Sequence, residues 1–177
     1  PLLKAFEQVA IKKTSARLII VGHGPLFKDI EFEMLNLALG SKVIFTGAVS
    51  NPDLPDYINL ADVFIDLSSR RSGFEPSVLE AMAQKKVIIG SEVSPISTIV
   101  EDGVDGFLIR PADSNSLAQL IIKIFLGQIP TEQIGEQARH KIMNIFDTNK
   151  MVHLTVAAYK KALENTGFYQ SSFKFWG

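Results

Sequence analysis

The sequence LADVFIDLSSRRSGFEPSVLEAMAQKKVIIGS, residues 60–91, contains two short β-branched runs separated by a loop and a helical pattern. The runs at 62–67 and 86–90 predict buried strands, because strands covered on both faces are continuous apolar runs. Between them, Gly73 permits a tight turn and Pro76 suits the first position of a helix. The stretch therefore predicts a strand–helix–strand unit with parallel strands.

The same alternation extends along most of the chain. Further strands are predicted at 17–22, 42–47 and 106–111. Helices are predicted at 2–13, 27–39, 54–61, 114–127, 131–146 and 148–165, with a short segment at 94–103. Alternating strands and helices predict an α/β fold, a Rossmann-like parallel sheet with helices on both faces.

The pattern favours a single domain over residues 1–166 and an aromatic C-terminal tail over 167–177. Since the first element is a helix, we expect that a strand ahead of it has been truncated. Phe173, Phe175 and Trp176 of the tail are expected to pack on the body or to contact a further domain.

Composition excludes several classes of function. An apolar fraction of 46% and a charged fraction of 21% are typical of a globular domain, and a net charge of −1 argues against nucleic-acid binding. The chain has no cysteine, so it has no disulfide and no thiolate metal site, which fits a cytoplasmic location. No apolar run reaches the ~18 residues of a membrane span.

Candidate site residues follow the strands, because ligands of open parallel sheets bind beyond the carboxyl ends of the strands. Gly22, His23 and Gly24 follow the strand at 17–22 and permit a close backbone approach to a nucleotide, or simply form a turn. At the start of the helix at Pro76, the free amides of Ser77 and Val78 are expected to bind an anion such as phosphate.

Glu80 lies four residues after Pro76, about one helical turn from the expected anion site. A carboxylate there could accept hydrogen bonds from both hydroxyls of a ribose while the amides hold a phosphate. A solvated acid on the wet face of the helix explains the same spacing, and the spacing alone leaves both interpretations open.

Other chemistries lack their motifs. A nicotinamide-binding fingerprint needs a third glycine where Phe27 stands, and an acid at the end of the next strand, where Thr46 and Gly47 stand. The three histidines are scattered and no HExxH pattern occurs, so metal is not indicated. The chain also has neither a GxSxG elbow nor a P-loop lysine motif.

Four motifs in fixed order, VGHGP (21–25), KVIFTGAV (42–49), the stretch 60–91 and IVEDGVDGFLIRPAD (99–113), together resemble the C-terminal donor-binding domain of family 4 retaining glycosyltransferases of GT-B fold. The resemblance covers roughly residues 1–160. It implies half of an enzyme that transfers a sugar from a UDP-, GDP- or ADP-sugar to a hydroxyl acceptor with retention, with no cofactor. It also implies a hexosyltransferase whose fragment is inactive alone.

The resemblance assigns roles to individual residues. The family's ribose-binding glutamate falls on Glu80, and its sugar-binding glutamate falls on Ser72, which departs from the pattern. Glu75 could replace that acid, or could simply stabilise the helix start. The nucleotide side of the site is expected to comprise Gly22, His23, Gly24, Gly47, Gly73, Phe74, Pro76, Ser77, Val78 and Glu80.

Further departures and absences leave alternatives open. Ser94-Pro95 and Ser97-Thr98 stand where the family has a glycine pair and Pro-Glu beside the sugar phosphate. The family's diphosphate-binding arginine and lysine, and its N-terminal acceptor domain, are expected upstream. A non-catalytic nucleotide-binding or scaffolding domain, a sugar-nucleotide epimerase and a nicotinamide oxidoreductase remain alternatives. Contact with the inner face of the membrane is left open.

Overall fold

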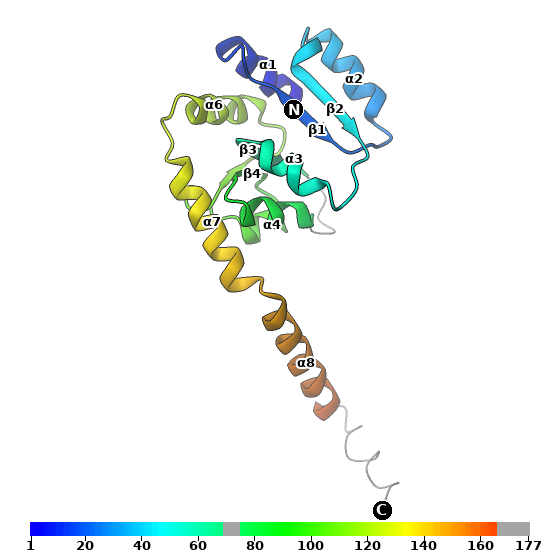
Figure 1. Cartoon of the computed structure of the whole chain (residues 1–177), viewed down its shortest axis with the longest axis vertical. Coiled ribbons are helices and arrows are strands. Elements are labelled where there is room, and N and C mark those ends of the chain that lie inside the picture. Colours follow the sequence, from blue (N-terminus) through cyan, green and yellow to red (C-terminus); the bar gives the residue numbers. More distant parts are fainter. Residues whose placement is uncertain (69–74, 166–177) are drawn as a thin grey trace, which may run out of the picture. The chain divides into compact units, whose positions relative to one another are not determined.

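A computed structural model describes residues 1–68 and 75–165, in which helices and parallel strands alternate (Figure 1). The strands are β1 (Leu18–Val21), β2 (Val43–Gly47), β3 (Val63–Asp66), β4 (Val87–Ser91) and β5 (Phe107–Ile109). The helices are α1 (Leu2–Lys12), α2 (Phe27–Asn36), α3 (Leu54–Leu60), α4 (Pro76–Ala83), α5 (Ile96–Ile99), α6 (Ser114–Phe125), α7 (Thr131–Ile145) and α8 (Thr148–Asn165), with a 3₁₀ turn at Gly40–Lys42. The predicted elements are confirmed, with small differences at their ends.

The strands form two parallel groups. β1 pairs with β2 in the register Leu18 opposite Val43, and β3, β4 and β5 pair in that order, with Val63 opposite Val87. The α/β fold with parallel strands is confirmed, but the single sheet that the sequence predicts is divided in two within the described residues.

One hydrophobic core lies under both groups of strands. Helix α1 packs against α6, and their apolar faces share a cluster with side chains from all five strands. All five residues of β4 are buried, and α4 and α5 also contact this strand. Helices therefore cover both faces of β4, which explains its uninterrupted apolar run.

The chain divides into two compact units, residues 1–140 and 141–177. In the second unit, α8 exposes a series of large apolar side chains, namely Met151, Val152, Leu154, Val156, Tyr159 and Leu163. None of the helices over residues 1–68 and 75–165 is both long and apolar enough to cross a lipid bilayer. The domain boundary at 166 stays a prediction, and the tail at 167–177 lies outside the described residues.

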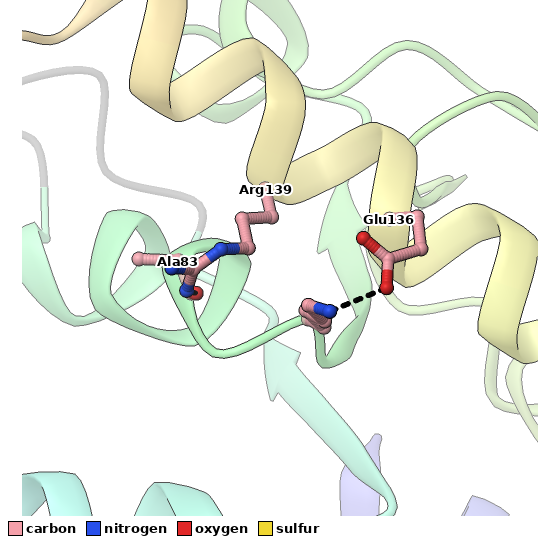
Figure 2. Close-up of polar contacts among 4 residues, drawn as sticks. Ala83, Glu136 and Arg139 are labelled. Atoms are coloured by element: carbon pink, nitrogen blue, oxygen red, sulfur yellow. Dashed lines mark hydrogen bonds and ion pairs between the residues drawn. The ribbon is translucent and has the colours of Figure 1, made fainter.

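The first turns of α7 fix the end of α4 (Figure 2). Arg139 donates a hydrogen bond to the carbonyl of Ala83, and Lys85 forms an ion pair with Glu136. Lys85 adopts a φ of 61°, a left-handed conformation that ends the helix. Because the last carbonyls of a helix have no intrahelical donor, the guanidinium of Arg139 satisfies one of them.

Gly135 brings α7 into close contact with this turn. A Cβ atom at position 135 would lie 2.2 Å from the carbonyl oxygen of Lys85, a backbone atom that cannot rotate away. We predict that Gly135→Ala lowers the free energy of unfolding by about 1–3 kcal/mol, as overpacking does. Urea unfolding measures the change. Gly40→Ala is the matched control, since nothing lies within 4 Å of a Cβ there, and equal stabilities of the two variants would contradict the packing.

Asp113 caps the N-terminus of α6. Its Oδ1 accepts a hydrogen bond from the Ser116 amide at 2.9 Å, and its Oδ2 accepts one from the Ser116 hydroxyl at 2.7 Å. These hydrogen bonds, the backbone one foremost, lower the pKa of the Asp113 carboxyl. A lowered folded-state pKa stabilises the fold above the unfolded-state pKa, and this contribution is lost as the pH falls through the folded-state pKa.

We therefore predict that Asp113→Asn lowers the melting temperature at about pH 7 and that the difference from the unmodified chain shrinks at about pH 3. The amide keeps an acceptor for Ser116 but lacks the charge that interacts with the helix dipole. Thermal unfolding followed by circular dichroism measures the effect. A difference that is the same at both pH values would show that the charge of Asp113 contributes nothing.

Candidate functional site at the carboxyl edge of the strands

The predicted site residues follow β1, β2 and β3 at the carboxyl ends of these strands. Gly22, His23 and Gly24 form the turn between β1 and α2, and Gly47 ends β2. Pro76 begins α4, the helix that follows β3. Since β1 and β2 are parallel to each other, the loops that follow them both emerge beyond strand ends, where open sheets bind ligands.

A backbone contact joins the loops after β1 and β2. The Gly22 amide donates to the Gly47 carbonyl at 2.9 Å, and the two residues form an isolated bridge beyond the strand pair. Both have positive φ, 119° at Gly22 and 70° at Gly47, and nothing lies within 4 Å of a Cβ built on either. Glycine at these two positions therefore permits the positive φ of the backbone, and the space that a side chain would occupy there is open.

Three aromatic side chains that are near these glycines in the sequence form two ring contacts. The ring centroids of His23 and Phe27 are 5.2 Å apart, and those of Phe27 and Phe45 are 5.1 Å apart in an edge-to-face arrangement. His23 is exposed, whereas Phe27 and Phe45 are half-buried. We call these three residues the aromatic row. Its outer ring offers a face on which a planar base can stack.

Sequence reasoning treated Phe27 only as the residue that replaces a third glycine, and so missed its place in the aromatic row. The sequence could have indicated this place, because Phe27 begins α2 two residues after the GHGP stretch. A residue at that position must lie near the end of β1 whatever its type.

The start of α4 confirms one expectation and corrects another. Pro76 occupies the first turn of the helix as predicted, and Glu75 precedes it with extended backbone, φ −83° and ψ 109°. The prediction of a free Val78 amide is wrong, because this amide donates to the Glu75 carbonyl at 3.1 Å. The Val78 side chain is also completely buried, so it belongs to the core. The Ser77 amide is left as the donor of this turn.

Glu80 lies one turn into α4 and its side chain is exposed. Among the described residues, no hydrogen bond or ion pair engages its carboxylate, while its backbone carbonyl accepts from the Gln84 amide at 3.1 Å. Glu75 is exposed as well and makes no capping hydrogen bond. The exposure of Glu80 is compatible with a solvated acid and with a carboxylate open to a ligand.

Three predicted contacts, Ser72, Gly73 and Phe74, lie outside the described residues. On the far side of β4, Pro95 precedes the short helix α5, and its carbonyl accepts from the Thr98 hydroxyl at 2.6 Å. A proline has no amide to offer a phosphate, so this turn lacks one donor. Within residues 1–68 and 75–165, histidine and acidic side chains do not gather into a group of three or more that could hold a metal ion.

A shallow hollow elsewhere on the molecule does not suit an anionic ligand. It lies where the chain enters α7, and its lining comprises Ile129, Pro130, Thr131, Glu132, Gln133 and Glu136. Helix α6 begins after β5 and runs back along the sheet, so the residues that follow it are distant from the carboxyl edge. Two acids in the lining would repel a phosphate.

Known proteins identify the fold and the family. The sequence model of the family described as "Glycosyl transferases group 1" matches residues 1–141. The chain belongs to the group 1 glycosyl transferases. This glycosyl transferase domain is 27% identical over 164 residues to N-acetyl-alpha-D-glucosaminyl L-malate synthase of Bacillus anthracis, covering 93% of this chain and 42% of that protein. It is also 27% identical over 158 residues to O-antigen chain mannosyltransferase C of Escherichia coli, covering 88% of this chain and 42% of that protein.

Solved structures agree with this assignment. The crystal structure of Anabaena Alr3699/HepE in complex with UDP-glucose superposes with a TM-score of 0.79 at 25% identity, covering 89% of this chain and 44% of that chain. Staphylococcus aureus TarM has the same fold, with a TM-score of 0.79 at 20% identity, covering 88% of this chain and 31% of that chain. Such neighbours are GT-B glycosyltransferases, so the glycosyl transferase domain is a Rossmann-like half of that architecture. The chain spans about two fifths of the length of the curated relatives named above.

Gly47, the left-handed glycine that ends β2, provides a test of the loop geometry. We predict that Gly47→Ala destabilises the domain by about 1–2 kcal/mol, because an alanine at a φ of 70° brings its Cβ close to the carbonyl oxygen. Gly24→Ala is the control, since this neighbouring glycine has no positive φ and nothing within 4 Å of a Cβ. Chemical unfolding of both variants compares them, and an unchanged stability of Gly47→Ala would contradict the described turn.

Proposed function

We propose that residues 1–166 form the donor-binding half of a retaining glycosyltransferase that transfers a hexosyl unit from a nucleotide sugar to a hydroxyl acceptor. Family membership supports the reaction class, and the UDP-glucose complex of Anabaena HepE supports a UDP-sugar as the first donor to test. The single observation that carries the proposal is the exposed, unengaged carboxylate of Glu80, one turn from the start of α4.

Glu80 binds the ribose of the donor in this proposal. The rise of the helix places residue 80 roughly 6 Å along the axis from Pro76, which spans the distance from a diphosphate to its ribose. An ionised carboxylate accepts hydrogen bonds only, and two adjacent hydroxyls donate two of them. The absence of an intramolecular partner within the described residues leaves both oxygens of Glu80 available.

The aromatic row and the Gly22–Gly47 bridge form the base side of the site. His23 and Phe27 supply ring faces beyond the end of β1, and the glycines keep the adjacent space clear of side chains. Stacking on aromatic rings tolerates any base, so the identity of the base is set by polar groups of the two loops.

The start of α4 binds the diphosphate. In this proposal the Ser77 amide and the positive end of the helix dipole interact with the negative charge that develops on the leaving group. As the bond between the sugar and the diphosphate breaks, the sugar becomes oxocarbenium-like and the charge on the diphosphate increases. An amide that interacts more strongly with this developing charge than with the intact nucleotide sugar lowers the activation barrier. The helix start offers one amide fewer than the sequence predicted. We therefore propose that other groups, such as the arginine and lysine expected upstream, also stabilise the diphosphate.

We propose that acceptor binding and sugar transfer require residues outside this chain. Relatives are more than twice as long as this chain, so we propose that an acceptor-binding half of the same polypeptide completes the enzyme. Alone, residues 1–177 bind the donor without transferring sugar. We propose a cytoplasmic location, the compartment that a cysteine-free chain fits.

Substitution of Glu80 tests the proposal. Isothermal titration with UDP, GDP and ADP, followed by UDP-glucose, is expected to show binding that Glu80→Gln weakens about 10- to 100-fold, since a hydrogen bond to a charged group contributes about 1.5–3 kcal/mol. Glu31→Gln is a matched control, because Glu31 is also exposed and is also the fifth residue of its helix, α2. Its affinity is expected to equal that of the unmodified chain.

Equal affinities of the Glu80 and Glu31 variants would refute the role of Glu80. Binding without sugar transfer by the complete polypeptide would favour a non-catalytic nucleotide-binding domain, the alternative that Ser72 raises.

A further inference from the structure

Helix α8 exposes its large apolar side chains to water. Every residue from 148 to 164 is exposed, and Met151, Leu154 and Tyr159 are 60%, 63% and 68% exposed. Isolated helices are only marginally stable in water, because most helical stability in proteins comes from the packing of an apolar face. Burial of these side chains would therefore stabilise α8.

Charged and uncharged side chains of α8 occupy separate parts of its circumference. At about 100° per residue, an arc of roughly 200° runs from Leu154 through Met151 to Val156. This uncharged arc also includes Val152 and Tyr159. The charged residues and the histidine of the helix share the remaining part, namely Lys150, His153, Lys160, Lys161 and Glu164. Such a separation, with lysines on the polar side, is typical of helices that lie in the plane of a membrane surface.

The uncharged arc is wider than the stripe that joins two paired helices. A helix pair buries a narrow stripe, which in α8 would comprise Val152, Val156 and Tyr159 at spacings of four and three residues. Such a pair would leave Met151 and Leu154 in water. A membrane surface accepts the entire arc, so the width of the arc favours lipid over a second helix.

Two copies of α8 would also lack opposite charges at their contact. The residues that border the stripe are His153 and Lys160 on one side and Thr155 and Ala162 on the other. Paired helices are often joined by opposite charges at these positions, and none of the four residues is an acid. A second copy of this chain is therefore a poor partner for this face of α8.

The distribution of charge along the chain indicates an anionic partner. Residues 141–177, the second compact unit, contain five lysines and two acidic residues, a net charge of +3. Residues 1–140 contain 13 basic and 17 acidic residues, a net charge of −4. An anionic lipid surface attracts basic segments, so it would attract the second unit and repel the first. Five of the last ten residues are aromatic, including Tyr169 and Trp176, whose residue types are enriched at membrane–water interfaces.

We propose that α8 binds the surface of an anionic lipid bilayer. The helix lies in the plane of the surface, with its uncharged arc at the boundary between the headgroups and the acyl chains. Its lysine side chains extend toward the headgroups, since a lysine keeps its ammonium group in the polar layer while its methylene stem covers apolar surface. This inference is independent of the proposed function, because no part of it involves the nucleotide site.

Vesicle sedimentation tests the proposal on residues 1–177 without nucleotide. Two vesicle compositions are compared, phosphatidylcholine alone and phosphatidylcholine with about 30% phosphatidylglycerol, which supplies the anionic surface. Binding to the anionic vesicles is expected to be at least about tenfold tighter and to weaken as the salt concentration rises, because salt screens the attraction between lysines and headgroups. Absence of binding to the anionic vesicles, or equal affinity for both compositions, would overturn the proposal.

Val156→Gln tests the uncharged arc, and Val104→Gln is its matched control. The two valines are 45% and 43% exposed, and Val104 lies in the loop before β5. Glutamine has a higher helix propensity than valine, so a loss of binding would not come from a melted helix. Val156→Gln is expected to weaken binding to the anionic vesicles about five- to tenfold, because it removes one apolar side chain from the lipid contact. Val104→Gln is expected to bind as the unmodified chain does, and equal affinities of the two variants would contradict the proposal.

Sedimentation equilibrium without lipid tests whether the arc belongs to a second copy instead. The unmodified chain and Val156→Gln are expected to have the same molar mass, since the arc contacts lipid and not protein. A dimer that Val156→Gln dissociates would overturn the proposal, because the arc would then be a contact between two copies of this chain.

Discussion

The packing of α1 on α6 is the contact on which the rest of the first unit depends. Within the described residues no strand pairing connects the β1–β2 group with the β3–β4–β5 group, so the shared apolar cluster under these two helices holds them together. Hydrogen bonds from Ser114 to the Pro1 carbonyl and from Gln8 to Asn115 join α1 to the start of α6. Apolar packing is non-directional and does not by itself fix how two elements are aligned. The hydrogen bonds between α1 and α6 therefore help to align the two groups of strands, a role that strand pairing would otherwise have.

The candidate site is also divided between the two groups of strands. Its base side, with the aromatic row and the Gly22–Gly47 bridge, is carried by the β1–β2 group. Its ribose and phosphate side, with Ser77 and Glu80, is carried by α4 beside β3. A nucleotide bound in the proposed way spans both groups, so the packing of α1 on α6 bears directly on affinity. The α7 contacts with Ala83 and Lys85 hold the other end of α4 and so contribute to the same geometry.

The sequence was sufficient for the elements and insufficient for their pairing. The β-branched runs gave every described strand, and Pro76 marked the start of α4 correctly, because proline constrains the backbone locally. Strand pairing depends on contacts between distant segments, so the local pattern does not show which strands pair or that β1 and β3 belong to different groups. The Val78 amide was misjudged for a similar reason, since the extended backbone of Glu75 determines whether its carbonyl turns toward that amide. The aromatic row also required three-dimensional contacts between Phe27 and Phe45, which are 18 positions apart in the sequence.

In the proposed function, one nucleotide lies across the carboxyl edge with its ribose at Glu80 and its base at the aromatic row. Intermolecular nuclear Overhauser effects between bound UDP and the ¹³C-labelled chain test it most directly. We expect cross-peaks from the ribose 2′ and 3′ protons to the Glu80 side chain, and from the base protons to the rings of His23 or Phe27. Cross-peaks confined to residues elsewhere, such as the hollow at Ile129–Glu136, would contradict it.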